Sequence, residues 1–329
     1  MIITRTPLRI SLAGGGTDIK SYYRFEPGKV INMAIDKYLY VVVKKQLGVV
    51  EYKYRINWST VEFCNKINQI KHPIVREALK YFKIDFPLEI TTFSDVPANT
   101  GLGSSSSFTV GLVYALSSFL GLKTSKYNIA TIAAKIEINL VKRSIGKQDH
   151  FSGTYGGMNI FSFYENEVVN IEPVIYKNET LKNLENSLML YYIGNKRSAS
   201  SMIKQQNKNI KKNFSVLSEM KSQVDIIKKI IQNGKKLNRL GKILNDGWNL
   251  KKKLSNKITS RKINLIYNLA INNGAIGGKV LGAGGGGFLL LYVPKNKKKN
   301  IRNKLRKFYQ MPFKIDQSGT RITYFENKI

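Results

Sequence analysis

A loop rich in glycine and small hydroxyl residues is the part of this chain best suited to chemistry. It reads Pro97-Ala98-Asn99-Thr100-Gly101-Leu102-Gly103-Ser104-Ser105-Ser106. Its glycines let backbone N–H groups turn inward and let a bulky anion come close. An apolar run at helical spacing follows, so the loop leads into a helix whose first amides are unpaired and carry partial positive charge. This combination predicts a phosphate-binding site.

Other glycine-rich or serine-rich sites fit this loop less well. A serine that caps a helix would explain one or two hydroxyls, but not four in succession beside two glycines. The loop lacks the last glycine of a dinucleotide fingerprint, and the sequence has no Gly-Lys-Ser/Thr ending for a Walker loop. A serine-hydrolase elbow is also absent, and the chain has only two histidines, His72 and His150. We therefore favour a phosphate cradle.

A second glycine loop, Gly14-Gly15-Gly16-Thr17-Asp18, follows Arg9 near the N-terminus. A simple turn needs neither an arginine before it nor an aspartate after it. Aspartate can accept two hydroxyl hydrogen bonds, and arginine can hold phosphate. The segment therefore suits a ligand with several hydroxyl groups.

Two acids and a third glycine cluster complete the candidate residues. Asp149 lies in the polar segment 146–150, which we expect to be a turn, and a carboxylate there could orient an acceptor hydroxyl and take its proton. Glu137 is the only acid along a helix expected from Thr124 or Ser125 to about residue 142, where a lone glutamate usually faces solvent. The cluster 282–287 leads straight into apolar residues, which predicts a close-approach loop and not a flexible linker.

Three of these segments, in this order, resemble the motifs of the GHMP kinases, which include galactokinase, homoserine kinase, mevalonate kinase and phosphomevalonate kinase. Pro97 to Ser105 is similar to the central Pro-x-x-x-Gly-Leu-Gly-Ser-Ser motif, Arg9 to Asp18 to the first motif and Lys279 to Phe288 to the last. Together they span nearly the whole chain. The form Ala-Gly-Gly-Gly-Thr-Asp resembles the D-glycero-D-manno-heptose 7-phosphate kinases, whereas galactokinases carry Gly-Glu-His-Thr-Asp.

The resemblance implies roles for individual residues. Asp149 would act on the acceptor hydroxyl, with Arg9 near that hydroxyl and the γ-phosphate, and whether Asp149 is a base or a positioner stays open. Mg²⁺ would be held by Glu137 with Ser105, or with Ser104 in its place. ATP would be bound by Pro97, Asn99, Gly101, Leu102, Gly103, Ser104, Ser105 and Ser106. The sugar would be bound by Arg9, Gly14, Gly15, Gly16, Thr17, Asp18, Asp149, Arg197, Gly284 and Gly285.

Arg197 lies in a segment that departs from the family's motif. The segment 194–199 resembles the family's Thr-Gly-x-Thr-Arg-x-Ala, with Lys196 in place of the second threonine. Arg197 and Lys252 are candidates for the distal phosphate of the sugar, and a surface ion pair is an equal alternative for each. His150 departs from the polar residue expected after Asp149, and we assign it no role.

The fold implied by the resemblance is α+β, the two-domain GHMP kinase fold. Residues 1–180 would form a domain like the second domain of ribosomal protein S5, and residues 181–329 a ferredoxin-like domain, with ATP and sugar in the cleft between them. Hydrophobic periodicity predicts strands and helices along the chain. The expected strands are 2–4 and 8–13, interrupted at Pro7, then 30–33, 38–44, 49–54, 88–92, 158–163, 168–171, 188–193, 288–293 and 321–325. The expected helices include 73–82, 224–231, 237–254 and 295–309.

Composition bounds the partners and the compartment. The formal net charge is +33, but lysines are spread along the whole chain, so we interpret most of the charge as a solvated surface that speeds capture of anionic substrates. We expect no nucleic-acid partner and no membrane partner. No apolar run is long enough to span a membrane, no signal peptide is evident, and the single cysteine, Cys64, agrees with a cytoplasmic protein. A homodimer is compatible with the sequence.

The predicted activity is transfer of the ATP γ-phosphoryl group to the anomeric hydroxyl of D-glycero-D-manno-heptose 7-phosphate. The product would be the 1,7-bisphosphate, used to make nucleotide-activated heptose. One alternative is another sugar 1-kinase of the family, such as a fucokinase-like enzyme. A second is a basic nucleic-acid-binding protein with a decayed kinase site, against which the intact residues Asp18, Ser105, Glu137 and Asp149 argue.

Overall fold

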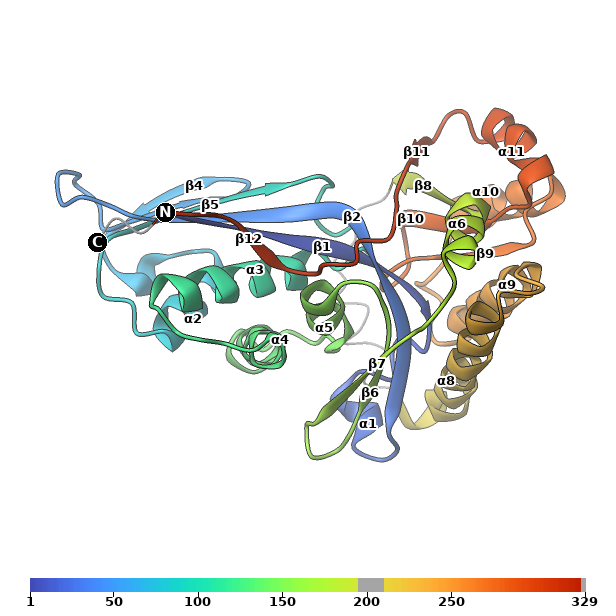
Figure 1. Cartoon of the computed structure of the whole chain (residues 1–329), viewed down its shortest axis with the longest axis horizontal. Helices are drawn as coiled ribbons and strands as arrows, with labels where there is room; N and C mark the ends of the chain where they lie inside the picture. Colours follow the sequence, from blue (N-terminus) through green and yellow to red (C-terminus); the bar gives the residue numbers. More distant parts are fainter. Residues whose placement is uncertain (195–209, 327–329) are drawn as a thin grey trace.

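Two β-sheets with flanking helices make up the computed structural model, which describes residues 1–194 and 210–326 (Figure 1). The first sheet has eight strands in the order β12-β1-β2-β5-β3-β4, with β6 paired to β2 and β7 to β6. All of its pairings are antiparallel except that of β3 with β5. The strands are β1 (Ile2–Ala13), β2 (Gly28–Lys45), β3 (Tyr54–Asn57), β4 (Val61–Cys64), β5 (Leu88–Ser94), β6 (Met158–Phe163), β7 (Val169–Pro173) and β12 (Arg321–Phe325).

The second sheet is antiparallel, in the order β11-β8-β10-β9. Its strands are β8 (Leu188–Gly194), β9 (Gly277–Val280), β10 (Gly287–Tyr292) and β11 (Tyr309–Met311). After β11 the chain returns to the first sheet, where Phe325 of β12 lies opposite Ile2 of β1. The expected boundary at residue 180 falls between the two sheets, but the C-terminal segment contributes one strand to the first sheet.

Helices cover one face of the first sheet and also pack against the second (Figure 1). Those near the first sheet are α1 (Lys20–Tyr23), α2 (Pro73–Tyr81), α3 (Ser104–Phe119), α4 (Lys126–Ala134), which continues as a π-helix (Lys135–Leu140), and α5 (Gln148–Tyr155). Those near the second sheet are α6 (Asn178–Ser187), α8 (Ile210–Asn233), α9 (Asn238–Lys253), α10 (Arg261–Asn272) and α11 (Lys298–Lys304). Short 3₁₀ turns lie at Ile67–Gln69 and Lys295–Lys297.

The long strand β2 organises the first sheet. Its first part, Gly28 to Met33, pairs with β6, and its second part, Leu39 to Lys45, pairs with β5. We expected Pro7 to interrupt the first strand, and residues 30–33 and 38–44 to form separate strands; both predictions were wrong. β1 passes through Pro7 with a register shift between Pro7 and Leu8, because a bulge tolerates a residue without an N–H donor.

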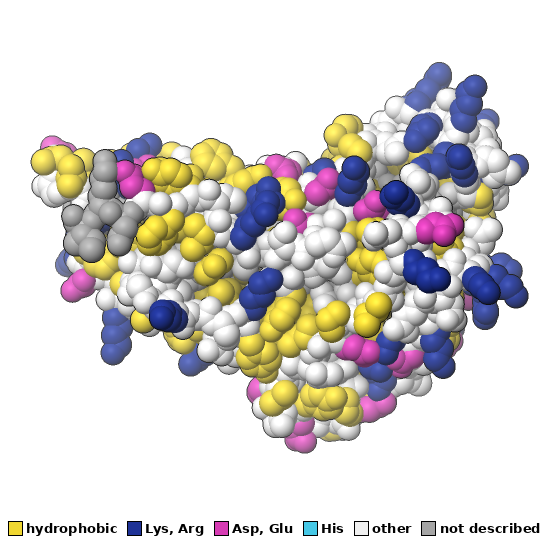
Figure 2. All heavy atoms as spheres, in the orientation of Figure 1, with side chains coloured by type: hydrophobic (Ala, Val, Ile, Leu, Met, Phe, Trp, Pro, Cys, Tyr) yellow, Lys and Arg dark blue, Asp and Glu magenta, His cyan; other side chains and the backbone are white. Residues whose placement is uncertain are grey.

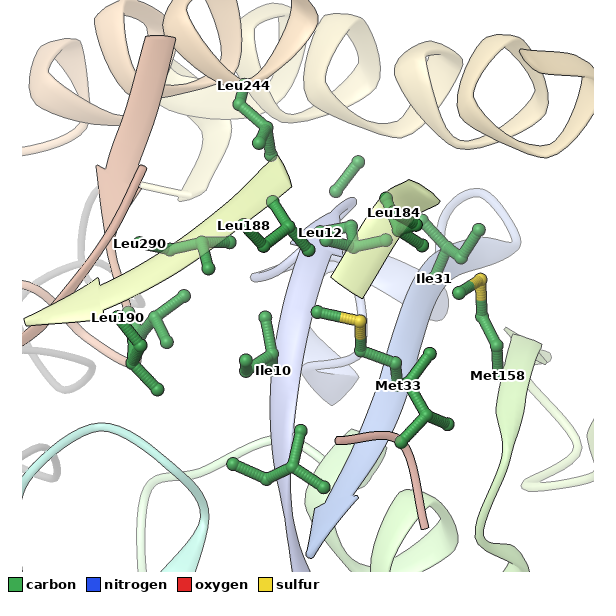
Figure 3. Close-up of a cluster of buried hydrophobic side chains, with 14 of the residues drawn as sticks. Ile10, Leu12, Ile31, Met33, Met158, Leu184, Leu188, Leu190, Leu244 and Leu290 are labelled. Carbon is green, nitrogen blue, oxygen red and sulfur yellow. The ribbon is translucent and has the colours of Figure 1, made fainter. Parts of the chain in front are cut away.

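A buried apolar cluster joins the two sheets (Figure 3). Ile10 and Leu12 of β1 lie near Leu188 and Leu190 of β8, and Leu244 of α9 covers this junction; each is at most 4 % exposed. Apolar burial of this kind stabilises by about 25 cal/mol per Å². The cluster therefore fixes the loops at the end of β1 relative to those that border β9 and β10.

Several expected elements were confirmed. The strand before the serine-rich loop is β5 and the helix after it is α3. His72 caps α2 by accepting a hydrogen bond from the Val75 amide at 3.3 Å, and Ser125 caps α4. Trp248 of α9 is fully buried.

Three expectations were wrong. The strand expected at 49–54 is β3, which begins only at Tyr54, and the basic helix expected at 295–309 is limited to α11. The segment 146–150 is not simply a turn, because α5 begins at Gln148.

Positive side chains are distributed widely over the face shown in Figure 2, and several gather at the end that contains α11. This distribution agrees with a solvated basic surface. No helix in the described ranges 1–194 and 210–326 has the length and apolar character to cross a membrane.

Two glycines form a very close contact between the loop before α3 and the loop after β9. A Cβ atom on Gly282 would lie 2.5 Å from the Cα of Gly101, and one on Gly101 would lie 2.6 Å from the Leu281 carbonyl oxygen. Both residues also have positive φ, +67° and +86°. Only glycine meets both requirements, so the contact fixes the distance between the two loops.

We predict that Gly282→Ala destabilises the protein by clearly more than the ~1–2 kcal/mol expected for a non-glycine residue at positive φ, because the added methyl group also collides with Gly101. Urea unfolding measures the difference. Gly121→Ala is the matched control, since Gly121 has φ +70° and no atom within 4 Å of its Cβ position. Equal destabilisation in the two variants would show that the loops can separate without loss of free energy.

Candidate active site

The three glycine-rich segments converge on one pocket, as the sequence predicted. Of the predicted site residues, Arg9, Gly15, Gly16, Asp18, Asn99, Gly101, Gly103, Ser104, Ser105, Ser106, Glu137 and Asp149 line it. Gly14, Thr17, Pro97, Leu102, Gly284 and Gly285 lie outside its lining, and Arg197 lies outside the described residues. The sugar-binding and ATP-binding roles assigned to all these residues stay predictions.

The serine-rich loop presents the N-terminus of α3 to the pocket. Gly103 precedes the helix with φ +81°, in the left-handed region. A Cβ atom there would lie 3.1 Å from Asp149 Oδ2, so glycine lets the acid approach the loop. With Ser104, Ser105 and Ser106 in the first turn of α3, the pocket has backbone amides and hydroxyls suited to an anion.

Arg9 and Asp149 form a bidentate ion pair at the centre of the pocket. Arg9 Nε donates to Asp149 Oδ1 at 2.6 Å and Nη2 donates to Oδ2 at 2.8 Å. The remaining nitrogen, Nη1, donates to the Gly101 carbonyl at 2.7 Å. Arg9 is 4 % exposed, and such a fork geometry holds a carboxylate in one orientation. The acid in the first turn of α5 is thereby fixed beside the phosphate loop.

Asp18 is a buried acid that lines the same pocket. Its Oδ1 accepts from the Gly16 amide at 3.0 Å and its Oδ2 from the Gln148 amide at 3.2 Å. Burial, and then the negative charge of Asp149, raise the pKa of Asp18 above its ordinary value. The backbone bonds orient the carboxylate and leave lone pairs free for hydroxyl groups of a ligand.

Thr17 and Gly14 hold the backbone of the loop that carries Asp18. Thr17 Oγ1 donates to the Gly14 carbonyl at 2.8 Å and to the Lys29 carbonyl at 3.0 Å. A Cβ atom on Gly14 would collide with the same Lys29 carbonyl. Both residues therefore shape the loop that carries Asp18.

Glu137 is fully buried, contrary to the usual exposure of a lone glutamate on a helix. It lies in the π-helical turn that follows α4 and accepts hydrogen bonds from several side chains. Ser105 Oγ donates to Oε1 at 2.6 Å and Ser106 Oγ to Oε2 at 3.0 Å. Arg143 Nη1 lies 2.8 Å from Oε1 and also contacts the Ser105 hydroxyl.

His150, to which we assigned no role, lies directly behind Glu137. Its Nε2 is 2.9 Å from Glu137 Oε2, and its ring is fully buried. Burial favours the neutral form of Glu137, but the hydrogen bond and charge of His150, together with Ser105 and Arg143, outweigh it and lower the pKa of Glu137 to about 2. The carboxylate is therefore held ionised against α3.

Five further polar side chains line the pocket and were not predicted. Two are lysines, Lys251 at the end of α9 and Lys279 on β9. Lys251 follows Leu244 and Trp248 at helical spacing, so a lysine within an apolar stripe was the signal that could have revealed it. The other three are Ser11, Arg143 and Gln148.

Lys252, the neighbouring candidate for the distal phosphate, does not line the pocket. Its Nζ lies 5.9 Å from the centre of the Trp248 ring. The residue that reaches the pocket is therefore one position earlier in the chain than expected.

Comparison with known proteins identifies the family. Residues 68–157 match the family described as "GHMP kinases N terminal domain", and residues 226–310 match "GHMP kinases C terminal". A D-glycero-alpha-D-manno-heptose 7-phosphate kinase from Campylobacter jejuni is 33% identical over 97% of this chain and 98% of its own length. The L-fucokinase/L-fucose-1-P guanylyltransferase of Bacteroides fragilis is 26% identical over 91% of this chain but only 35% of its own.

The fold is also found among solved structures. A D-glycero-D-manno-heptose 1-phosphate kinase from Bacteroides thetaiotaomicron superimposes with a TM-score of 0.81 at 24% identity, covering 99% of this chain and 100% of the other. The predicted α+β fold is thus confirmed. Since a relative of nearly equal length is 33% identical and both family domains match in order, this chain belongs to the GHMP kinases, phosphotransferases that act on an alcohol group.

Proposed function

We propose that this GHMP kinase transfers the γ-phosphoryl group of ATP to the anomeric hydroxyl of D-glycero-D-manno-heptose 7-phosphate and so forms the 1,7-bisphosphate. The observation that carries the proposal is the fixed Arg9–Asp149 pair, placed between the N-terminus of α3 and the buried Asp18. The heptose is named from the relative that is 33% identical and from the Gly-Gly-Gly-Thr-Asp loop. We place the reaction in the cytoplasm, where ATP is plentiful and the thiol of the single cysteine, Cys64, stays reduced.

The donor side of the pocket is the phosphate loop. Amides near Gly101 and Gly103 and the N-terminus of α3 bind the phosphates of ATP. Ser105 and Glu137 provide the hard oxygen ligands that Mg²⁺ prefers, and they already share a cation, the Arg143 guanidinium. When bound, the metal neutralises phosphate charge.

The acceptor side offers polar atoms that have no partner among the described residues. Ser11 Oγ and Gln148 Oε1 are buried without a hydrogen bond and both line the pocket near Asp18. A buried polar atom without a partner costs about 1–3 kcal/mol, so a ligand with several hydroxyls gains by pairing with them. Such a ligand is a sugar.

Asp149 acts on the hydroxyl that receives the phosphoryl group. It accepts the hydrogen bond of that hydroxyl and orients its oxygen for in-line attack, and it takes the proton as the phosphorus–oxygen bond forms. Arg9 keeps the carboxylate in one orientation and balances its charge. Asp18 holds neighbouring hydroxyls, so the sugar cannot rotate away from Asp149.

We predict that Asp149→Asn lowers kcat by ~10²–10⁴ while leaving ATP affinity nearly unchanged, because the amide keeps the shape but cannot accept the proton. Steady-state kinetics and calorimetric ATP titration measure the two quantities. Asp246→Asn, the same change at an exposed position of α9, is the control. Near-normal turnover of Asp149→Asn would remove Asp149 from the reaction.

The substrate is tested with a coupled ADP-release assay on heptose 7-phosphate, fucose, galactose and mevalonate. We expect kcat/KM for heptose 7-phosphate to exceed the others by at least about 10²-fold, the scale on which buried polar groups reject a ligand that leaves them unpaired. A preference for fucose would instead establish the fucokinase-like alternative.

Glu137 must be ionised to bind a metal ion. Its ionisation also makes the free energy of unfolding depend on pH. A carboxyl whose pKa falls from 4.5 to about 2 on folding stabilises the protein fully above pH 4.5 and loses that effect as the pH falls towards 2. We predict that Glu137→Gln lowers the free energy of unfolding on the order of 3 kcal/mol at pH 7, and that the difference shrinks between pH 4.5 and pH 3.

Urea unfolding at pH 7, 5 and 3.5 measures this difference, with Glu219→Gln, an exposed position on α8, as the control. The same Glu137 variant should need a higher Mg²⁺ concentration for half-maximal turnover. A stability difference that is constant with pH would show that Glu137 is not held as an anion.

A further inference from the structure

Two buried lysines form the wall of the pocket that faces the second sheet. Lys251 is 8 % exposed and Lys279 is 5 % exposed. Lys251 Nζ donates to the Gly282 carbonyl and, at 3.3 Å, to the Val280 carbonyl. Lys279 Nζ donates to the Leu12 carbonyl at 3.0 Å. Three of their six N–H donors therefore have partners among the described residues, and all three partners are uncharged.

Neither ammonium group forms an ion pair with an acid in the described part of the chain. The nearby acid Asp149 is already engaged on both oxygens by Arg9. Burial lowers the pKa of Lys251 well below its ordinary value, and the charges of Lys279 and Arg9 lower it further. Burial and the charge of Arg9 lower the pKa of Lys279 to about 8. In the free protein, burial therefore disfavours the charged form of both lysines, and an anion beside them would restore it.

Keeping a buried ammonium group charged costs several kcal/mol unless an anion accompanies it. If Lys279 served only to link β9 to β1, an uncharged hydrogen-bond donor would be sufficient. Its side chain would also not need to line the pocket. Both lysines line the pocket together with Arg9. Their arrangement therefore matches a site that is completed by an anionic ligand.

We propose that Lys251 and Lys279 form an oxyanion site for a phosphate group, an inference that rests on the proposed kinase reaction only for the identity of the molecule that carries the phosphate. Lys251 is anchored to Gly282, which touches Gly101 of the phosphate loop. Lys279 is anchored to Leu12, next to the unpartnered Ser11 of the acceptor wall. The site therefore lies where donor and acceptor meet.

Two sources can supply this phosphate. One is the phosphate that the acceptor sugar already carries, and the other is the phosphoryl group in transfer. Both have the same oxygens and negative charge, and both are recognised by ammonium groups as point charges. Kinetics separates them, because the first acts on acceptor binding and the second on the transition state.

The first experiment uses inorganic phosphate as the probe and needs no assumption about the reaction. Lys251→Gln and Lys279→Gln replace the ammonium group by an uncharged donor on a shorter side chain. Lys253→Gln is the control at an exposed position of the same helix. We expect phosphate, added at constant ionic strength, to stabilise the wild type and Lys253→Gln equally in thermal unfolding. Its apparent Kd should be at least 10-fold weaker for the two pocket variants.

The second experiment compares heptose 7-phosphate with the same heptose lacking the phosphate. If the acceptor supplies the anion, the pocket variants raise KM for the phosphorylated sugar at least 10-fold and leave kcat/KM for the unphosphorylated sugar and KM for ATP unchanged. If the anion is the transferred group, kcat falls at least 10-fold with both sugars. Either pattern supports the site and identifies its ligand.

Phosphate affinity and kinetics equal to those of Lys253→Gln would overturn the oxyanion site. The methionine variants Lys251→Met and Lys279→Met repeat the phosphate titration if a glutamine variant fails to fold. Should the phosphate titration succeed while none of the sugars is phosphorylated, the proposed reaction fails and the oxyanion site stands.

Discussion

The pocket depends on how one arginine is held. The backbone amide of Arg9 donates to the Leu102 carbonyl at 3.0 Å, and its side chain bonds the Gly101 carbonyl and both oxygens of Asp149. A single residue of β1 therefore ties the phosphate loop to α5. A buried guanidinium without an acid would cost several kcal/mol, so the fold and the position of the proposed catalytic carboxylate share one interaction. The bonds from Arg9 to Gly101 and Leu102 do not involve Asp149, so they can hold the serine-rich loop when Asp149 alone is changed.

The charged groups on the two sides of the Arg9–Asp149 pair differ in how well they are balanced by opposite charge. On one side Glu137 is surrounded by donors and remains an anion. On the other side burial and Asp149 disfavour the charged form of Asp18, while Lys251 and Lys279 have no acid to balance them. Where donor and acceptor meet, the free pocket thus lacks the anion that would keep these lysines charged. A bound phosphate group would supply that anion, which favours ligands that carry such a group over neutral sugars.

Local sequence motifs predicted most of this site, and long-range pairing explains what they missed. Arg9, Asp18, Ser105 and Asp149 lie in short segments whose residue types already indicate their chemistry. Lys251 and Lys279 do not, because lysines occur throughout the chain and only the packing of α9 against β9 brings these two together. The same limit applied to the fold: the strand β5 and the helix α3 followed from periodicity, whereas the continuity of β1 through Pro7 depends on its pairing with β2.

Surface charge and buried charge have different effects in this protein. The net charge of +33 attracts any polyanion, and salt screens it beyond about 8 Å at physiological ionic strength. The buried lysines are screened far less and act only on a group small enough to enter the pocket. Surface charge can therefore raise the rate of encounter with ATP and sugar phosphates without choosing among them. Discrimination between a phosphorylated and a neutral sugar has to come from the pocket, where a phosphate oxygen can interact with each buried lysine that has no acid partner.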